Sequence, residues 1–377
     1  MLARISTPRY TNTMSPPRDL RRLPKAHLHL HLEGAMRPAT LDDLCTRAGI
    51  ERPADTRGQR FPHFGGFNAI YWAACHCIRT RGDLARLILE VAEDAAAQGV
   101  WWIEPAFDAD RYCALREGSP HRLFDSQAEG WHFAIDAAAA ASRATGVGIG
   151  FMAAIDRSMP VEQGLERARA TTDLVRADAH LIESGMAAFP GRHPGIVALG
   201  LHGNEQGYPP EPFEEAFRIG AAEAGLLSTP HAGEIAPVPG GGPASVAGAL
   251  DRLGANRILH GVLAAADPAL VDRLARARIC LDVCPSSNLQ LSVYLTIDDH
   301  PLALLMRAGV PCSLGSDDPL LFGPDLVDEF TLCRTEMGFD DAQIATLAQN
   351  SFEFSGAPAA VKAAGIAAVA AWRDGSG

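Results

Sequence analysis

The sequence predicts a closed barrel of eight parallel strands, each followed by a helix, in one α/β domain. Eight short apolar runs alternate with longer segments of helical periodicity, which is the order expected of parallel strands and the helices that connect them. The runs lack polar alternation, as strands buried on both faces do. Strands are therefore expected within residues 23–31, 99–107, 146–155, 195–203, 225–231, 256–261, 278–285 and 309–317.

Helices are expected between these runs. Residues 84–98 place Leu84, Leu87, Ile88 and Val91 at the spacing of one helical face. Similar patterns occupy residues 124–143, 161–183, 212–223, 243–253, 268–276 and 301–307, and several begin with proline, a favoured first helical residue. The alternative is a doubly wound open sheet. It requires a glycine-rich phosphate turn after an early strand, which this sequence lacks.

Composition excludes several classes of protein. The 377 residues are 47% hydrophobic and 21% charged, as in globular proteins. A net charge of −12 argues against a nucleic-acid partner. No apolar stretch reaches the roughly 18 residues of a membrane span. The eight cysteines contain no C-x-x-C pair, so buried reduced thiols and a cytoplasmic location are expected. Residues 1–22 hold five arginines and three prolines without an apolar signal-peptide segment, which predicts a disordered tail before one domain at 23–377.

Histidines and acids gather at the ends of the predicted strands. His29 and His31 are two residues apart, so both point to one side of a strand. A third strand end carries His231, and another carries Asp317. Barrel enzymes place their chemistry at the carboxyl ends of the strands. Three histidines and a carboxylate form the ligand set of a divalent ion, most simply zinc, with a position left open for water.

Five motifs carry a family resemblance. LPKAHLHLHLEGAMRP, HAGE, RILHG, CPSSN and SLGSDDP occur in the order and spacing of the adenosine deaminase family, over residues 23–356. The resemblance implies a (β/α)₈ barrel with one zinc ion, bound by His29, His31, His231 and Asp317. It also implies four further roles. Glu234 resembles the family's proton donor to the purine ring, and His260 resembles the group that orients and helps to deprotonate the attacking water. Asp318 resembles the hydrogen-bond partner of purine N7, and Gly203 resembles the backbone donor to N3.

The implied reaction is hydrolysis of a 6-aminopurine to its 6-oxo product and ammonia. Water attacks C6 while Glu234 protonates N1, which requires a carboxylic acid kept neutral by a raised pKa. Another class of zinc deaminases carries H-x-E followed by P-C-x-x-C. His31-Leu32-Glu33 fits the first half of that signature by chance. No P-C-x-x-C follows, so that class is excluded.

Some positions depart from the family pattern or leave alternatives open. Glu33 stands where adenosine deaminases carry an aspartate facing the ribose, and we expect it to accept a bond from a sugar hydroxyl. Asn204 replaces a second aspartate. His202 is either a core residue or a substrate contact, and strand alternation favours the core. The glycine-rich segment 237–243 is either a lid or a surface loop.

The sequence therefore predicts a deaminase of a 6-aminopurine nucleoside, with a small molecule as its partner. Free adenine or a 5′-modified adenosine such as aminodeoxyfutalosine is the alternative substrate. An inactive nucleoside-binding relative is the alternative of another class. The intact Glu234, His260 and Asp317 argue against inactivity.

Overall fold

Parallel strands close into a barrel in the computed structural model, which describes residues 18–61, 63–113, 122–183, 195–235 and 242–375. The ring has eight strand positions, or staves. Two of them are interrupted, so ten strands form the barrel in the described residues. The strands are β1 (Lys25–His31), β2 (Val100–Phe107), β3 (Gly148–Ile149), β4 (Phe151–Asp156), β5 (Ile196–His202), β6 (Leu227–Ser228), β7 (His231–Ala232), β8 (Arg257–His260), β9 (Cys280–Val283) and β10 (Cys312–Leu314).

Backbone hydrogen bonds close the ring. One sheet runs β1-β2-β4-β5-β6, with β3 on β2, and the other runs β10-β9-β8-β7. The N–H of Asn256 donates to Ser228 O at 2.9 Å and joins the two sheets on one side. On the other side, the N–H of His31 donates to Asp317 O at 3.0 Å, and the N–H of Asp317 donates to His29 O at 3.2 Å. Every strand pair is parallel. The eight predicted strands and the barrel are confirmed, and the open sheet is excluded.

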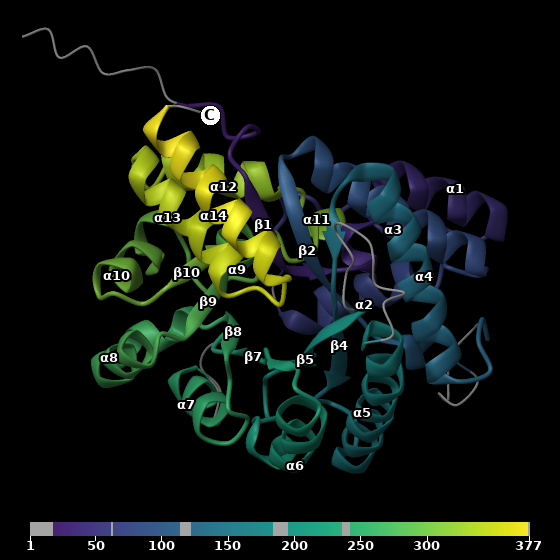
Figure 1. Cartoon of the computed structure of the whole chain (residues 1–377). Coiled ribbons are helices and arrows are strands. Elements are labelled where there is room, and N and C mark those ends of the chain that lie inside the picture. The colour runs from purple at the N-terminus through teal and green to yellow at the C-terminus, as the bar shows by residue number, and fades with distance from the viewer. Residues whose placement is uncertain (1–17, 62, 114–121, 184–194, 236–241, 376–377) are drawn as a thin grey trace, which may run out of the picture.

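The helices surround the strands (Figure 1). They are α1 (Pro38–Ala48), α2 (Phe64–Cys75), α3 (Arg81–Ala97), α4 (Gln127–Thr145), α5 (Val161–Glu183), α6 (Glu214–Phe217), α7 (Pro243–Asp251), α8 (Pro268–Ala277), α9 (Pro285–Gln290), α10 (Leu302–Arg307), α11 (Pro319–Phe322), α12 (Leu326–Thr335), α13 (Asp341–Glu353) and α14 (Ala359–Asp374). Each predicted helical segment overlaps one of them. Residues 212–223 differ from the prediction, because α6 is only one turn and continues as a π-helical turn at Arg218–Glu223.

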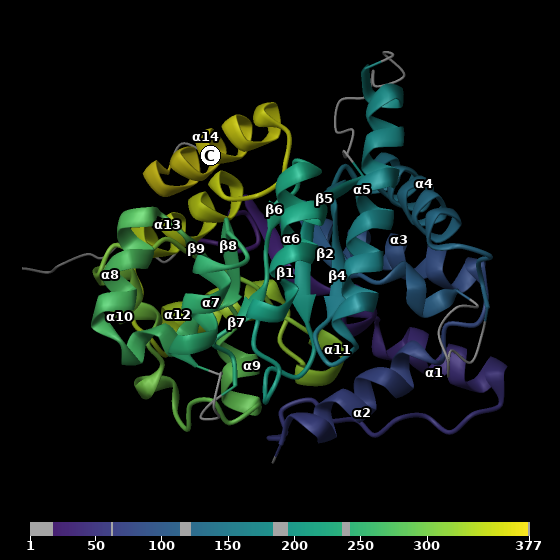
Figure 2. The ribbon, with the colours of Figure 1, turned by 90° about the horizontal axis from the view of Figure 1, so that it is seen from below.

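One end of the barrel is covered by α2. Figure 2 shows α2 near α11 at one end, with α14 at the opposite end. Phe67 of α2 stacks on Phe322 of α11, with the ring centroids 5.2 Å apart, and Phe61 and Leu321 complete a small apolar cluster. Since α11 follows Asp317 and Asp318 directly, this cluster fixes α2 over the strand ends that carry the candidate residues.

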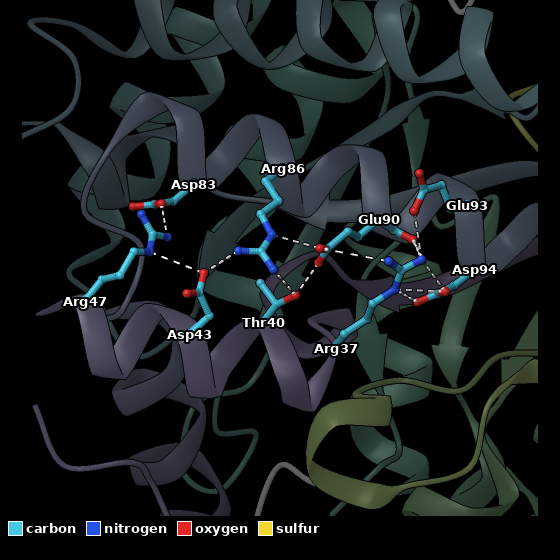
Figure 3. A network of polar contacts seen from close by, with 9 residues as sticks. All are labelled: Arg37, Thr40, Asp43, Arg47, Asp83, Arg86, Glu90, Glu93 and Asp94. Carbon is cyan, nitrogen blue, oxygen red and sulfur yellow. Dashed lines mark hydrogen bonds and ion pairs between the residues drawn. The ribbon is translucent and has the colours of Figure 1, made fainter.

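A ladder of ion pairs joins α1 to α3 (Figure 3). Arg37 contacts Asp94 at 2.7 Å, and Arg47 contacts Asp83 at 2.6 Å. Between them Arg86 of α3 bonds to Glu90 and to Asp43 of α1. Partly exposed pairs of this kind each add little free energy. Their alternating signs instead fix how α1 lies along α3.

The described residues before β1 pack on the domain. Leu20 is buried in the main core, and its carbonyl accepts a bond from Lys25 Nζ at 2.9 Å. Trp372 Nε1 donates to Asp19 O at 3.0 Å. Residues 1–17, which hold most of the expected tail, lie outside the described residues. All eight cysteines are buried, as expected, and none of them forms a disulfide bond. None of the described helices has the length and apolar character needed to cross a bilayer.

A cluster of charges is enclosed inside the barrel. Arg257 of β8 bonds to Glu104 of β2 at 2.7 Å and pairs with Asp282 of β9, and all three side chains are fully buried. The remaining oxygens are satisfied by Ser313 Oγ on Asp282 at 2.6 Å and by Trp102 Nε1 on Glu104 at 2.8 Å. Three staves are thus cross-linked by charged side chains that have no access to bulk solvent.

Replacement of Arg257 by methionine is expected to lower the free energy of unfolding by about 3–5 kcal/mol, because Glu104 and Asp282 remain buried without a cation. Urea denaturation followed by circular dichroism measures this change. The matched control is Arg218→Met, which removes an exposed arginine from its pairs with Glu215 and Glu223 and should leave the midpoint unchanged. Equal midpoints for the two variants would contradict the assignment.

Candidate active site

Three histidines and one aspartate from separate parts of the ring converge at the strand ends. His29 and His31 come from β1, His231 from β7, and Asp317 follows β10. Asp317 Oδ1 lies 3.4 Å from His29 Nε2 and 3.2 Å from His31 Nε2. One ligand-type atom from each of the four residues lies within 4.8 Å of all the others. The structure therefore brings together the whole ligand set that the sequence suggested.

The chemistry of this cluster fits a metal ion. His29 Nδ1 contacts the carbonyl oxygen of Asp282 at 2.7 Å, which turns Nε2 toward the cluster. That Nε2 atom and both ring nitrogens of His231 are buried without a hydrogen-bond partner among the described residues. Ser287 Oγ donates to Asp317 Oδ2 at 2.7 Å and holds the carboxylate in place. Buried imidazole nitrogens without partners are costly unless a ligand, such as a metal ion, satisfies them.

Two residues of the site have strained backbones. His260 and Asp317 have φ values of 64° and 59°, in the left-handed region that residues with a Cβ avoid. Each stands where a strand gives way to the following turn. The conformation turns their side chains into the mouth of the barrel, which is where strained residues of enzymes tend to occur.

Glu234 and His260 face each other beside the ligand cluster. His260 Nε2 lies 3.4 Å from Glu234 Oε1 and 3.8 Å from Asp317 Oδ2. Burial, reinforced by the charges of Asp317 and Glu205, raises the pKa of Glu234 well above its usual range. Burial also lowers the pKa of His260 well below its usual range. Both pKa shifts favour the uncharged forms of the two side chains.

Asp318 presents a second neutral carboxyl group. Burial and the adjacent Asp317 raise the pKa of Asp318 well above its usual range. Its Oδ1 is buried without a hydrogen-bond partner among the described residues. Gly34 makes room for this group, since a Cβ at Gly34 would lie 1.7 Å from Asp318 Oδ1. A neutral carboxyl in this position can donate a hydrogen bond into the pocket.

One pocket is lined by His202 and by five of the residues described above: His31, His231, Glu234, Asp317 and Asp318. The pocket is bounded by aromatic residues of α2, by Asp156 and Ser158, and by Gly203 and Asn204. The ring centroid of His202 lies 4.4 Å from that of His231, and both ring nitrogens are buried without a hydrogen-bond partner among the described residues. The residue before it on the same side of the strand is Gly200, where a Cβ would lie 2.3 Å from His202 Nε2. His202 therefore points into the pocket, whereas alternation favoured a place in the core.

Glu33 also lines the pocket, but its carboxylate is already occupied. It accepts hydrogen bonds from Tyr112 OH at 2.7 Å, Arg111 Nη1 at 3.0 Å and Tyr71 OH at 3.2 Å. A carboxylate offers about four acceptor positions, so roughly one remains for a ligand. Glu33 is predicted from the sequence, but its three partners are not. These partners come from α2 and from the short helix after β2 rather than from strand ends.

Sequence reasoning also missed how CPSSN acts. Within that motif Ser287 bonds to Asp317, and the amide of Asn288 lies 3.4 Å from His260 Nδ1. The motif was recognised, and its position directly after a strand was the signal that could have assigned it these roles. Most of the segment 237–243 lies outside the described residues, so the alternatives of lid and surface loop stay predictions.

The fold and the site define a metal-dependent hydrolase built on a (β/α)₈ barrel. A family model described as adenosine deaminase matches residues 24–372. A Streptomyces virginiae protein whose name gives adenosine and adenine as alternative substrates of a deaminase is 39% identical, with 96% of this chain and all of that protein covered. The chain therefore belongs to the adenosine deaminase family.

Other relatives agree with this assignment. An aminodeoxyfutalosine deaminase of Streptomyces coelicolor is 35% identical and covers 90% of this chain and 82% of its own length. The crystal structure of an adenine deaminase from Arthrobacter aurescens is 30% identical, has a TM-score of 0.77, and covers 93% of this chain and 99% of its own. An amidohydrolase from Burkholderia ambifaria with bound Zn is 25% identical, with a TM-score of 0.74 and coverage of 95% and 92%. The chain is a hydrolytic deaminase that acts on a purine, and it carries a candidate metal site.

The purified chain is expected to hold about one divalent ion, which elemental analysis by mass spectrometry measures. The double variant His29→Ala, His231→Ala removes two of the four candidate ligands and should lose the ion. His132→Ala, which alters an exposed histidine of α4, should keep it. About two tightly held ions per chain, or full metal content in the double variant, would contradict the ligand assignment.

Proposed function

We propose that this chain removes the 6-amino group of an adenosine-like nucleoside by hydrolysis, with one Zn²⁺ per chain bound by His29, His31, His231 and Asp317. The observation that carries the proposal is the pair of Glu234 and His260, which face each other 3.4 Å apart beside the ligand cluster. A buried acid and a buried base side by side are what addition of water to a purine ring requires.

A set of three imidazoles and one carboxylate favours zinc over harder ions such as magnesium. When bound, the ion supplies Lewis acidity and lowers the pKa of a water molecule to about 7. The related amidohydrolase with bound Zn supports this choice of metal.

The protein's own groups then move the protons. His260, neutral because burial lowers its pKa, accepts a proton from the attacking water. Glu234, neutral because burial raises its pKa, gives a proton to N1 of the ring. Attack at C6 forms a tetrahedral carbon that carries both the hydroxyl and the amino group. His260 passes its proton to the amino group, which leaves as ammonia, and the hydroxyl proton returns to Glu234 as the 6-oxo group forms. Substrate and water together supply every atom of the two products.

Two further groups orient the purine. Asp318, protonated for the reasons given above, donates to N7. Gly203 also lines the pocket, and its N–H donates to N3. Gly203 has a φ of 88°, and a Cβ there would lie 2.6 Å from Asp156 Oδ1, so other residues are strained at this position.

The charges of the pocket support a nucleoside rather than a nucleotide. Six carboxyl groups line it, of which Glu234 and Asp318 are neutral in this proposal and Asp317 binds the ion. Three charged carboxylates, Glu33, Asp108 and Asp156, remain beside one arginine, Arg111, which is already paired with Glu33. A phosphate would meet like charge without a free cation. The remaining acceptor position of Glu33 suits one sugar hydroxyl. Free adenine is the second candidate, favoured by the three bonds that Glu33 already accepts and by the likeness to an adenine deaminase.

Glu234→Gln should keep its metal and bind substrate, while kcat falls by about 10²–10⁴-fold because the general acid is lost. Ammonia release under saturating adenosine measures kcat, and elemental analysis checks the metal. Glu215→Gln, an exposed carboxylate of α6, is the matched control and should turn over like the unmodified enzyme. A Glu234→Gln variant that retained more than about a tenth of the activity would show that another group is the acid.

A panel of substrates tests whether the pocket requires a sugar on the purine and whether it rejects a phosphate. We expect kcat/KM to be highest for adenosine, 2′-deoxyadenosine or a 5′-modified adenosine, and at least about 10²-fold lower for AMP because of like-charge repulsion. Glu33→Gln should lower kcat/KM for the nucleosides and change that for adenine much less. A clear preference for adenine in the unmodified enzyme would refute the nucleoside assignment and establish the second candidate.

A further inference from the structure

We propose that Glu205 is a positioning residue that holds Glu234 in its reactive place by binding three consecutive backbone N–H groups. The inference rests on the proposed function, because it takes Glu234 as the proton donor. Glu205 lies just after β5, is 1% exposed, and is absent from the lining of the pocket, so it acts without touching the substrate.

The contacts are short and directed. Glu205 Oε1 accepts from the N–H of Gly233 at 2.7 Å. Its Oε2 accepts from the N–H of Glu234 at 3.0 Å and from that of Ile235 at 2.8 Å. A single carboxylate thus satisfies the backbone on both sides of the candidate acid.

These backbone groups need such a partner. Strand β7 ends at Ala232, and Gly233 turns out of the strand with a φ of 67°, so the next amides have left the β-ladder. Gly233 and Glu234 are buried, and a buried N–H without an acceptor is costly. Glu205 supplies the acceptors that the strand no longer offers, and this fixes the direction in which the Glu234 side chain leaves the turn.

A second buried side chain holds the other end of the same segment. Arg157, fully buried after β4, donates from Nη2 to the carbonyl of His231 at 2.8 Å. Its Nη1 lies 3.9 Å from Glu205 Oε1, which gives the carboxylate a nearby cation. Residues 231–235 are therefore held from two neighbouring staves. Arg157 holds the part of this segment that carries the candidate ligand His231, and Glu205 holds the part that carries the candidate acid.

The variant Glu205→Gln tests the inference. A glutamine keeps the size of the side chain but has one acceptor oxygen, and its NH₂ group must face a backbone N–H. We expect kcat to fall by about 10²-fold, the loss typical of a misplaced catalytic group, with KM and metal content nearly unchanged. Hydrogen exchange of the peptide that contains residues 233–235 should become faster.

A double-mutant cycle separates positioning from general damage. If Glu205 acts through Glu234, adding Glu205→Gln to Glu234→Gln should reduce kcat by less than about threefold further, since coupled residues are not additive. The matched control is Asp83→Asn, because Asp83 likewise accepts two backbone N–H groups, from Arg79 and Thr80, but lies at the start of α3. It should lower the melting temperature without a change in kcat.

Several outcomes would overturn the inference. They are a Glu205→Gln variant with kcat within about threefold of the unmodified enzyme, a full additive loss in the double variant, or unchanged exchange at 233–235. If Glu205→Gln does not fold, Glu205→Asp replaces it. This side chain is one methylene shorter and cannot reach all three N–H groups, so the same selective loss of kcat is expected. Absence of deaminase activity in the unmodified enzyme would refute the proposed function instead, while the exchange measurement would still report on the contact.

Discussion

The structure depends on one buried ionic interaction, that of Arg257 with Glu104 and Asp282. The guanidinium group cross-links three staves inside the ring, and Asp282 continues the connection upward, because its carbonyl contacts Nδ1 of His29. Asp282 thus has two roles: its carboxylate pairs with Arg257, and its carbonyl sets the direction in which the His29 imidazole faces the candidate metal site. A barrel filled only with aliphatic side chains could be as stable, but it would not tie the orientation of a ligand to the closure of the sheet.

Much of the fold was predictable because parallel strands covered on both sides leave an unmistakable pattern. The apolar runs located every stave, including the one that splits into β6 and β7. The helices that escaped prediction include α2, whose residues face the pocket on one side and the apolar cluster on the other. Such a helix shows no single apolar stripe, so periodicity does not reveal it. The helices α12 to α14 were not predicted either, because they follow the last strand and lie outside the alternation of strands and helices.

The candidate site likewise contains residues that the sequence predicts and residues that it does not. Residues at strand ends were accessible to sequence reasoning, because the barrel fixes where a strand end lies even when its neighbours are unknown. Partners brought in by loops and short helices were not, as with Tyr71 and Arg111 around Glu33. His202 shows a third limit. Alternation placed it on one side of its strand, but only the structure shows that the ring packs over Gly200, which has no side chain, and lines the pocket.

The left-handed backbones of His260 and Asp317 have a consequence for how this family can change over time. Each such conformation costs on the order of 1–3 kcal/mol in a residue with a Cβ. Selection for stability and selection for turnover therefore oppose each other at two defined positions. A descendant freed from catalysis gains stability by adopting glycine or asparagine there, since both tolerate that backbone. With the roles proposed for His260 and Asp317, engineering for heat resistance has to look elsewhere in the barrel.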